Sequence, residues 1–156
     1  MPDTRIGGLF REEIKSYILS WEEDIEISEE VAVGWRFVGT PRKLDLVLKH
    51  ADRYLGIEAK YQGGSGTVDQ KLIYTLEDAI SCPIPTLVVF AGEITNDIKA
   101  KLITSGLGLE VKYDPDAPPG KRLDDTGELF RQRVYIELGL DWFKLKSFKP
   151  KKRGDN

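Results

Sequence analysis

The fold is decided by residues 43–60, which read KLDLVLKHADRYLGIEAK. Apolar side chains recur at every second position in 43–49 and again in 54–60, which is the spacing of half-buried strands. The polar connection 50–53 between them predicts an antiparallel hairpin. With the turn centred on Ala51 and Asp52, three apolar pairs share one face: Leu44 with Ala59, Leu46 with Ile57 and Leu48 with Leu55.

The other face of this hairpin carries two carboxylates and a lysine. Asp45 lies across from Glu58, and Lys60 follows two residues along on the same side. Facing carboxylates repel at a cost of up to about 1 kcal/mol, whereas Mg²⁺ is typically held by one or two carboxylates with waters and phosphate oxygens. A lysine beside the ion can orient water or stabilise charge at phosphorus. This face therefore predicts a metal-dependent phosphodiester site, and the alternative is an exposed sheet face with a Glu–Lys ion pair.

Helices and further strands are expected around the hairpin. We expect helices in residues 1–25, 67–80 and 95–105, and strands in 31–38, 86–91 and 107–113. The continuous apolar run 86–91 predicts a strand buried on both faces. Residues 126–145 alternate in part like a strand, but Gly139 stands where a helix would end, and we favour a helix. The sum is a mixed α/β sheet with helices packed on it.

Asp45, followed after twelve residues by Glu58-Ala59-Lys60, resembles the motif of the PD-(D/E)XK nuclease superfamily, which includes restriction endonucleases and RecB-type exonucleases. The element order over residues 8–92 is similar to that superfamily's αβββαβ core. Pro41 lies four residues before Asp45, so the Pro-Asp dipeptide itself is absent. The resemblance implies a restriction-endonuclease-like fold with flanking helices. It also implies that Asp45, Glu58 and the Ala59 carbonyl bind Mg²⁺, with Mn²⁺ able to substitute, and that Lys60 assists the attacking water.

Residues 70–74, QKLIY, resemble the Gln-x-x-x-Tyr element of RecB-type nucleases. The resemblance implies that Gln70 steadies substrate or water, and that Gln70, Lys71 and Tyr74 contact the nucleic acid. Ordinary solvent-facing side chains are the alternative. Many RecB-type members also hold a cysteine-ligated cluster, which Cys82 cannot supply because it is the one cysteine of the chain.

The superfamily often takes a further acid from its first helix. In this sequence Glu13 flanks the apolar stripe that contains Phe10, Ile14 and Tyr17, whereas Glu12 lies nearly opposite. The resemblance therefore implies Glu13 as an additional catalytic acid that binds the metal through water. A solvated flanking acid is the alternative.

Composition restricts the remaining possibilities. With 156 residues and a net charge of −3, the chain suits one nuclease-like domain, residues 1–145, and excludes coating of nucleic acid by bulk charge. Residues 146–156 form a basic tail that we expect to be disordered and either to contact DNA or simply to aid solubility. The glycine-rich stretch 63–66 lacks a P-loop ending, so no nucleotide cofactor is expected. No apolar run is long enough for a membrane span, and a cytoplasmic location is expected.

The sequence thus predicts a Mg²⁺-dependent DNA nuclease, an endonuclease rather than an exonuclease. A homodimer is expected because two sites are needed to cut both strands of a duplex. Two other classes stay open. One is a nuclease-like domain that binds nucleic acid without cutting it or serves as a partner subunit, and the other is a small structural or interaction domain.

Overall fold

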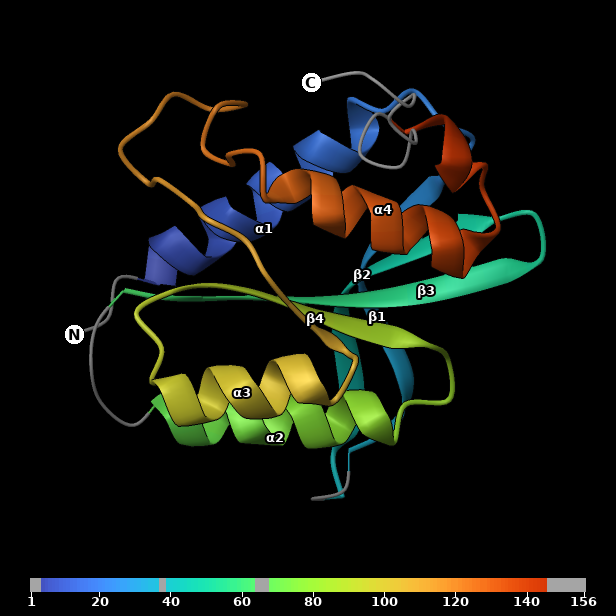
Figure 1. Ribbon diagram of the computed structural model, residues 1–156. Helices are drawn as coiled ribbons and strands as arrows, with labels where there is room; N and C mark the ends of the chain where they lie inside the picture. Colours follow the sequence, from blue (N-terminus) through green and yellow to red (C-terminus); the bar gives the residue numbers. More distant parts are fainter. Residues whose placement is uncertain (1–3, 37–38, 64–67, 146–156) are drawn as a thin grey trace, which may run out of the picture.

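The computed structural model describes residues 4–36, 39–63 and 68–145 (Figure 1). The elements in chain order are α1 (Thr4–Leu19), β1 (Glu26–Trp35), β2 (Pro41–His50), β3 (Arg53–Gln62), α2 (Val68–Ile80), β4 (Thr86–Gly92), α3 (Asn96–Thr104), β5 (Gly108–Glu110), α4 (Gly127–Leu138) and the 3₁₀ turn η1 (Trp142–Lys144). Within these residues five strands form one sheet in the order β1-β2-β3-β4-β5. β1, β2 and β3 pair antiparallel, whereas β3, β4 and β5 pair parallel. The predicted mixed sheet is confirmed.

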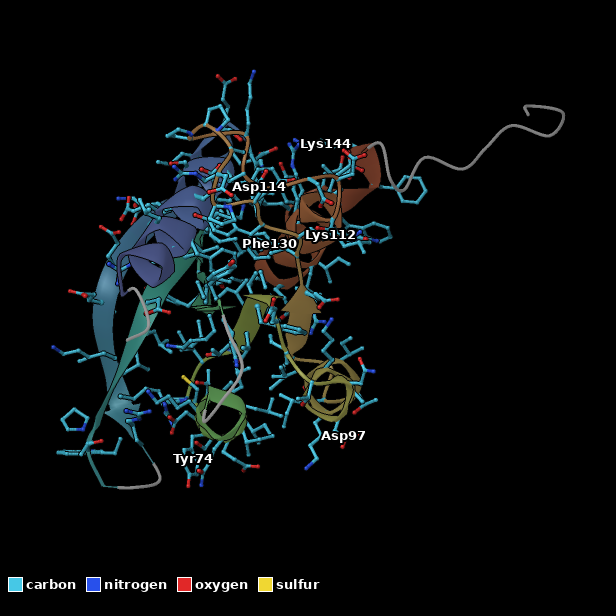
Figure 2. All side chains as sticks on the ribbon, turned by 90° about the vertical axis from the view of Figure 1, so that its left-hand side faces the viewer. Tyr74, Asp97, Lys112, Asp114, Phe130 and Lys144 are labelled. Carbon is cyan, nitrogen blue, oxygen red and sulfur yellow. The ribbon has the colours of Figure 1, made fainter. Side chains whose placement is uncertain are left out.

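Helices cover both faces of the sheet (Figure 1). α1 and α4 lie on one face, and α2 and α3 lie on the other. Figure 2 shows Phe130 in the layer between α4 and the sheet, and Tyr74 beside α2 on the opposite side of the molecule. β4 supplies both apolar cores, since Leu87 and Val89 join the cluster under α1 and α4 while Val88 joins the cluster under α2 and α3. The prediction that residues 86–91 are buried on both faces is therefore correct.

The first helix and the first strand differ from the predicted boundaries. The helix ends at Leu19 rather than near residue 25, and Trp21 and Ile25 pack on the same core from the segment that follows. The helical spacing of these apolar residues thus reflects a shared core rather than a continuous helix. β1 begins at Glu26 instead of 31, because an edge strand tolerates the charged residues at its start. Residues 37–38, at the predicted end of this strand, lie outside the described residues.

The last third of the chain contributes one short strand to the sheet. β5 spans only Gly108–Glu110, because Val111 turns into the core and Tyr113 forms an isolated bridge with Leu123. The helix favoured for residues 126–145 is present as α4 and stops at Gly139, whose φ of 75° is the left-handed cap that glycine adopts readily. The predicted tail 146–156 lies outside the described residues. None of the described helices combines the length and the apolar character that crossing a membrane requires.

Candidate active site

The hairpin pairing of β2 with β3 stops just before the two carboxylates. Leu46 pairs with Ile57 and Leu48 with Leu55, as predicted, and Leu46–Ile57 is the last pair of the ladder. Beyond it the N–H of Asp45 donates to Oε1 of Glu58 at 3.3 Å, and the N–H of Ala59 donates to Oδ2 of Asp45 at 2.8 Å. The Asp45 carboxylate therefore takes the place of the backbone carbonyl that a regular antiparallel ladder would offer to the N–H of Ala59, and the Glu58 carboxylate accepts the N–H of Asp45.

The predicted pairing of Leu44 with Ala59 is wrong. Leu44 lies over β3 at Gly56, where an added Cβ would come within 2.7 Å of Leu44 Cδ1. The neighbouring strand is irregular at the same level, because Glu29 pairs with Leu46 and Val31 with Leu44, while the intervening Glu30 has a φ of 51°. The β2–β3 ladder ends at Leu46–Ile57, so the regular pairing that the prediction assumed does not extend to Leu44.

Lys60 completes a compact group with the two acids. Its Nζ lies 3.3 Å from Oε2 of Glu58 and 3.9 Å from Oδ2 of Asp45. The lysine side chain is 39 % exposed, whereas that of Glu58 is 11 % exposed. The structure therefore brings together the three side chains that the sequence placed on one face.

Burial sets the protonation of Glu58. Desolvation raises the pKa of Glu58 to about 7, and the nearby charge of Asp45 raises it further, against the opposing effect of the Lys60 ammonium. A carboxylate that is costly to ionise in a metal-free site gains from a cation that neutralises it.

The backbone of Ala59 faces the same gap. The N–H of Gly56 bonds to the Pro85 carbonyl, and the Gln62 carbonyl accepts from Glu93, so the even-numbered residues of β3 bond toward β4. The N–H and C=O of one strand residue point the same way, and those of Ala59 therefore face β2, where its N–H meets Asp45.

These oxygens fit a hard divalent cation. No cluster of three or more His, Cys, Asp or Glu side chains suited to a metal occurs in 4–36, 39–63 and 68–145. Two carboxylates and a backbone carbonyl are nevertheless a donor set that Mg²⁺ accepts, because it commonly keeps several waters and is bound through one or two carboxylates.

Two cavities border the group. The smaller, about 120 Å³, is lined by Asp45, Glu58 and Lys60 together with residues of β2 and α2. The larger, about 350 Å³, extends along α2 and shares Arg36, Lys60 and Thr75 with the smaller one. The carboxylates thus lie at the end of a continuous path along β3 and α2.

The α2 residues predicted to contact nucleic acid border this path unequally. Lys71 and Tyr74 line the larger cavity, and Tyr74 is 42 % exposed. Gln70 is exposed and donates from Nε2 to the Tyr74 hydroxyl at 2.9 Å, so its amide reaches the path through Tyr74.

The structure does not bring Glu13 into this group. Its carboxylate is 5 % exposed and accepts from the N–H of Gly120 at 2.9 Å and of Arg122 at 3.4 Å. α1 also lies on the sheet face opposite α2 (Figure 1). Glu13 therefore holds the loop between β5 and α4, and it is not among the residues that line either cavity.

Sequence reasoning missed five polar residues around the smaller cavity. They are Arg36, Arg42, Lys43, Thr75 and Asp78. A signal existed for two of them, because Thr75 and Asp78 continue from Lys71 at helical spacing and so define one polar face of α2. Both are buried, at 8 % and 7 % exposure, which marks this face as directed toward the sheet.

The fold and the carboxylate–lysine group together define a nuclease-type α/β domain, and a family comparison agrees. The family model of the PD-(D/E)XK nuclease superfamily domain matches residues 7–104. The chain belongs to this superfamily, and its mixed sheet with flanking helices is the restriction-endonuclease-like fold.

Similarity to individual proteins is lower. No curated protein matches the chain. Among solved structures, a protein of unknown function, AF1548, is 15 % identical with a TM-score of 0.49, covering 83 % of this chain and 79 % of that one. SfsA of Pyrococcus furiosus, solved in complex with Ca²⁺, is 18 % identical with a TM-score of 0.41, covering 70 % of this chain and 58 % of that one.

The raised pKa of Glu58 predicts a distinctive pH dependence of stability. The folded, metal-free protein binds the Glu58 proton more tightly than the unfolded chain, so protonation stabilises the fold fully below about pH 4.5 and this contribution disappears as the pH rises through about 7. In EDTA, the free energy of unfolding of the wild type should fall by up to about 3 kcal/mol relative to Glu58→Gln between those limits. Urea titrations at several pH values measure this, and parallel pH profiles for the two proteins would refute it.

Glu13→Gln should weaken the fold without weakening metal binding. The amide keeps the shape but removes the charge that two backbone N–H groups bond, which costs about 1–3 kcal/mol. Glu12→Gln is the matched control, since Glu12 is exposed one residue earlier on the same helix and its substitution should change stability by less than about 0.5 kcal/mol. Urea denaturation measures the stability of both variants, and calorimetry with Mn²⁺ measures their metal affinity. A loss of Mn²⁺ affinity in Glu13→Gln with unchanged stability would make Glu13 a metal-site acid instead.

Proposed function

We propose that the protein is a Mg²⁺-dependent DNA nuclease that hydrolyses phosphodiester bonds as an endonuclease. The observation that carries the proposal is the meeting of Asp45 and Glu58 between diverging strands, with the Lys60 ammonium 3.3 Å from Glu58. Membership of the PD-(D/E)XK nuclease superfamily supports phosphodiester hydrolysis as the reaction class.

The metal ligands proposed are the carboxylates of Asp45 and Glu58 and the carbonyl of Ala59. Mn²⁺ should substitute for Mg²⁺, because it shares the preference for carboxylate and carbonyl oxygens. When bound, such an ion polarises a phosphodiester oxygen and lowers the pKa of a bound water. Glu58 must lose its proton to bind a cation, so metal affinity rises as the pH passes through about 7.

Lys60 is proposed to act on the reacting phosphate. Its side chain is the most exposed of the three, so the ammonium can reach a phosphate at the cavity while staying beside Glu58. There it orients the attacking water and stabilises the negative charge that develops in the transition state.

Gln70, Lys71 and Tyr74 are proposed to hold the DNA along α2. Lys71 offers a cation to the phosphate backbone, and Tyr74 offers an exposed ring beside it. Gln70 positions the Tyr74 hydroxyl through their hydrogen bond and can steady substrate or water. A homodimer in the cytoplasm completes the proposal, because two copies would present two sites to a duplex.

Glu58→Gln and Lys60→Ala should each slow plasmid cleavage in Mg²⁺ by at least about 100-fold, since each removes a group that stabilises the transition state. Calorimetry with Mn²⁺ should separate them, with affinity lost in Glu58→Gln and largely kept in Lys60→Ala.

The controls are Lys99→Ala and Glu110→Gln, which break an ion pair of 2.8 Å between α3 and β5. Both should cleave like the wild type. Equal cleavage by all five proteins would refute the site, and DNA binding by the wild type without any Mg²⁺-dependent product would favour a non-cleaving binding domain or partner subunit.

A further inference from the structure

A second charged group lies behind the carboxylates. Asp78 of α2 and Arg42 of β2 are 7 % and 3 % exposed, and Arg42 Nη2 lies 3.9 Å from Oδ1 of Asp78. Arg42 also donates from Nη2 to the Ser81 hydroxyl at 2.7 Å. This contact fastens β2 to the end of α2.

Arg36 joins this group from the end region of the β1–β2 hairpin. It follows β1 directly, and its Nε donates to Oδ2 of Asp78 at 2.9 Å. The side chain nevertheless remains 44 % exposed. It lines both the cavity that holds the two catalytic carboxylates and the larger cavity along α2. Arg36 thus stands where the two cavities meet.

The charge around the smaller cavity suits an anion next to a metal. Four cationic side chains among its described lining residues meet three carboxylates: Arg36, Arg42, Lys43 and Lys60 against Asp45, Glu58 and Asp78. The cationic side chains outnumber the carboxylates even without a metal, which favours phosphate oxygens, and a divalent cation that neutralises Asp45 and Glu58 increases this excess of positive charge. A guanidinium anchored at Nε still presents its two Nη groups, whose fork matches a phosphate.

A purely structural ion pair explains this arrangement less well. A partly exposed Arg–carboxylate pair contributes about 0–1 kcal/mol to stability, whereas burying Asp78 is costly unless it is paired. A buried carboxylate that fixes one edge of an exposed guanidinium at a cavity mouth is instead how a binding side chain is held in place.

We propose that Arg36 binds a nucleic-acid phosphate that neighbours the cleaved one, and that Asp78 is the positioning residue that aims it. The proposal rests on the proposed function, because it assigns the substrate of that same site. Arg36 then belongs to the binding surface that continues through Lys60 and Lys71.

The experiment measures fluorescence anisotropy of a labelled 20-nucleotide DNA, single-stranded and duplex, in EDTA so that no cleavage occurs. Arg36→Gln should weaken the affinity about 5- to 10-fold and lower the slope of log K against log salt by about 0.9 for duplex, the loss of one phosphate contact. The control is Arg133→Gln, which removes an arginine of similar exposure that pairs with Glu137 on α4, and it should bind like the wild type.

Asp78→Asn separates positioning from bulk charge. It removes a negative charge, so an effect of net charge alone would strengthen DNA binding, whereas loss of the anchor weakens it. Arg36→Gln added to Asp78→Asn should cost less affinity than Arg36→Gln alone. Urea denaturation of each variant confirms that the comparison is between folded proteins. Tighter or unchanged binding by Asp78→Asn would overturn the positioning role.

The outcomes distinguish this proposal from the nuclease assignment. Equal affinity and salt slope for Arg36→Gln and Arg133→Gln would overturn the phosphate site even if the wild type cleaves DNA. Weakened binding by Arg36→Gln in a protein that cleaves nothing would retain the phosphate site and reject the nuclease. A wild type that binds neither DNA at low salt would overturn the phosphate site, whereas plasmid cleavage in Mg²⁺ decides the nuclease assignment separately.

Discussion

The exchange of backbone hydrogen bonds for carboxylate hydrogen bonds between β2 and β3 is the constraint on which the site depends. Beyond Leu46–Ile57 the strands no longer pair, and the N–H groups of Asp45 and Ala59 bond to carboxylates of the opposite strand. A buried N–H without a partner is costly, so the backbone itself fixes the two acids in the gap. β3 is meanwhile held along its other edge by β4. The gap therefore lies on the β2 side of β3, and the hydrogen bonds that join the two strands there also position the two acids of the site.

This arrangement concentrates negative charge at a buried position and compensates it incompletely. Lys60 neutralises part of it, but desolvation still raises the pKa of Glu58 to about 7. The metal-free site is therefore less stable than an apolar packing would be, which is a common property of binding sites that are built ahead of their ligand. A proton or a divalent cation can relieve the same strain, and the two compete for the same carboxylate. The exposed ammonium is then available to the substrate rather than needed as the sole counter-ion.

The spacing of apolar and polar residues along the sequence predicted the features that depend on neighbours within one strand or helix. Alternating leucines determined the register of Leu46 with Ile57, and the same alternation placed Asp45, Glu58 and Lys60 together. It failed at Leu44 because the β2–β3 ladder ends at Leu46–Ile57, where carboxylates accept the backbone N–H groups, and the alternation of apolar residues gives no sign of this. Glu13 was correctly placed beside the apolar stripe, but its partner Gly120 is 107 residues away and only the folded chain brings it near. The contact of Arg36 with Asp78 could not be predicted from the sequence for the same reason, although the spacing of polar residues in α2 does indicate a polar face.

The gap between β2 and β3 is proposed to hold a divalent cation. Crystals of the wild-type protein soaked in Mn²⁺, with anomalous diffraction recorded at the manganese edge, provide a direct test. We expect an anomalous peak bounded by the carboxylates of Asp45 and Glu58 and the carbonyl of Ala59. A map with no peak there, or with its strongest peak at another group of acids, would show that the gap is not a cation site.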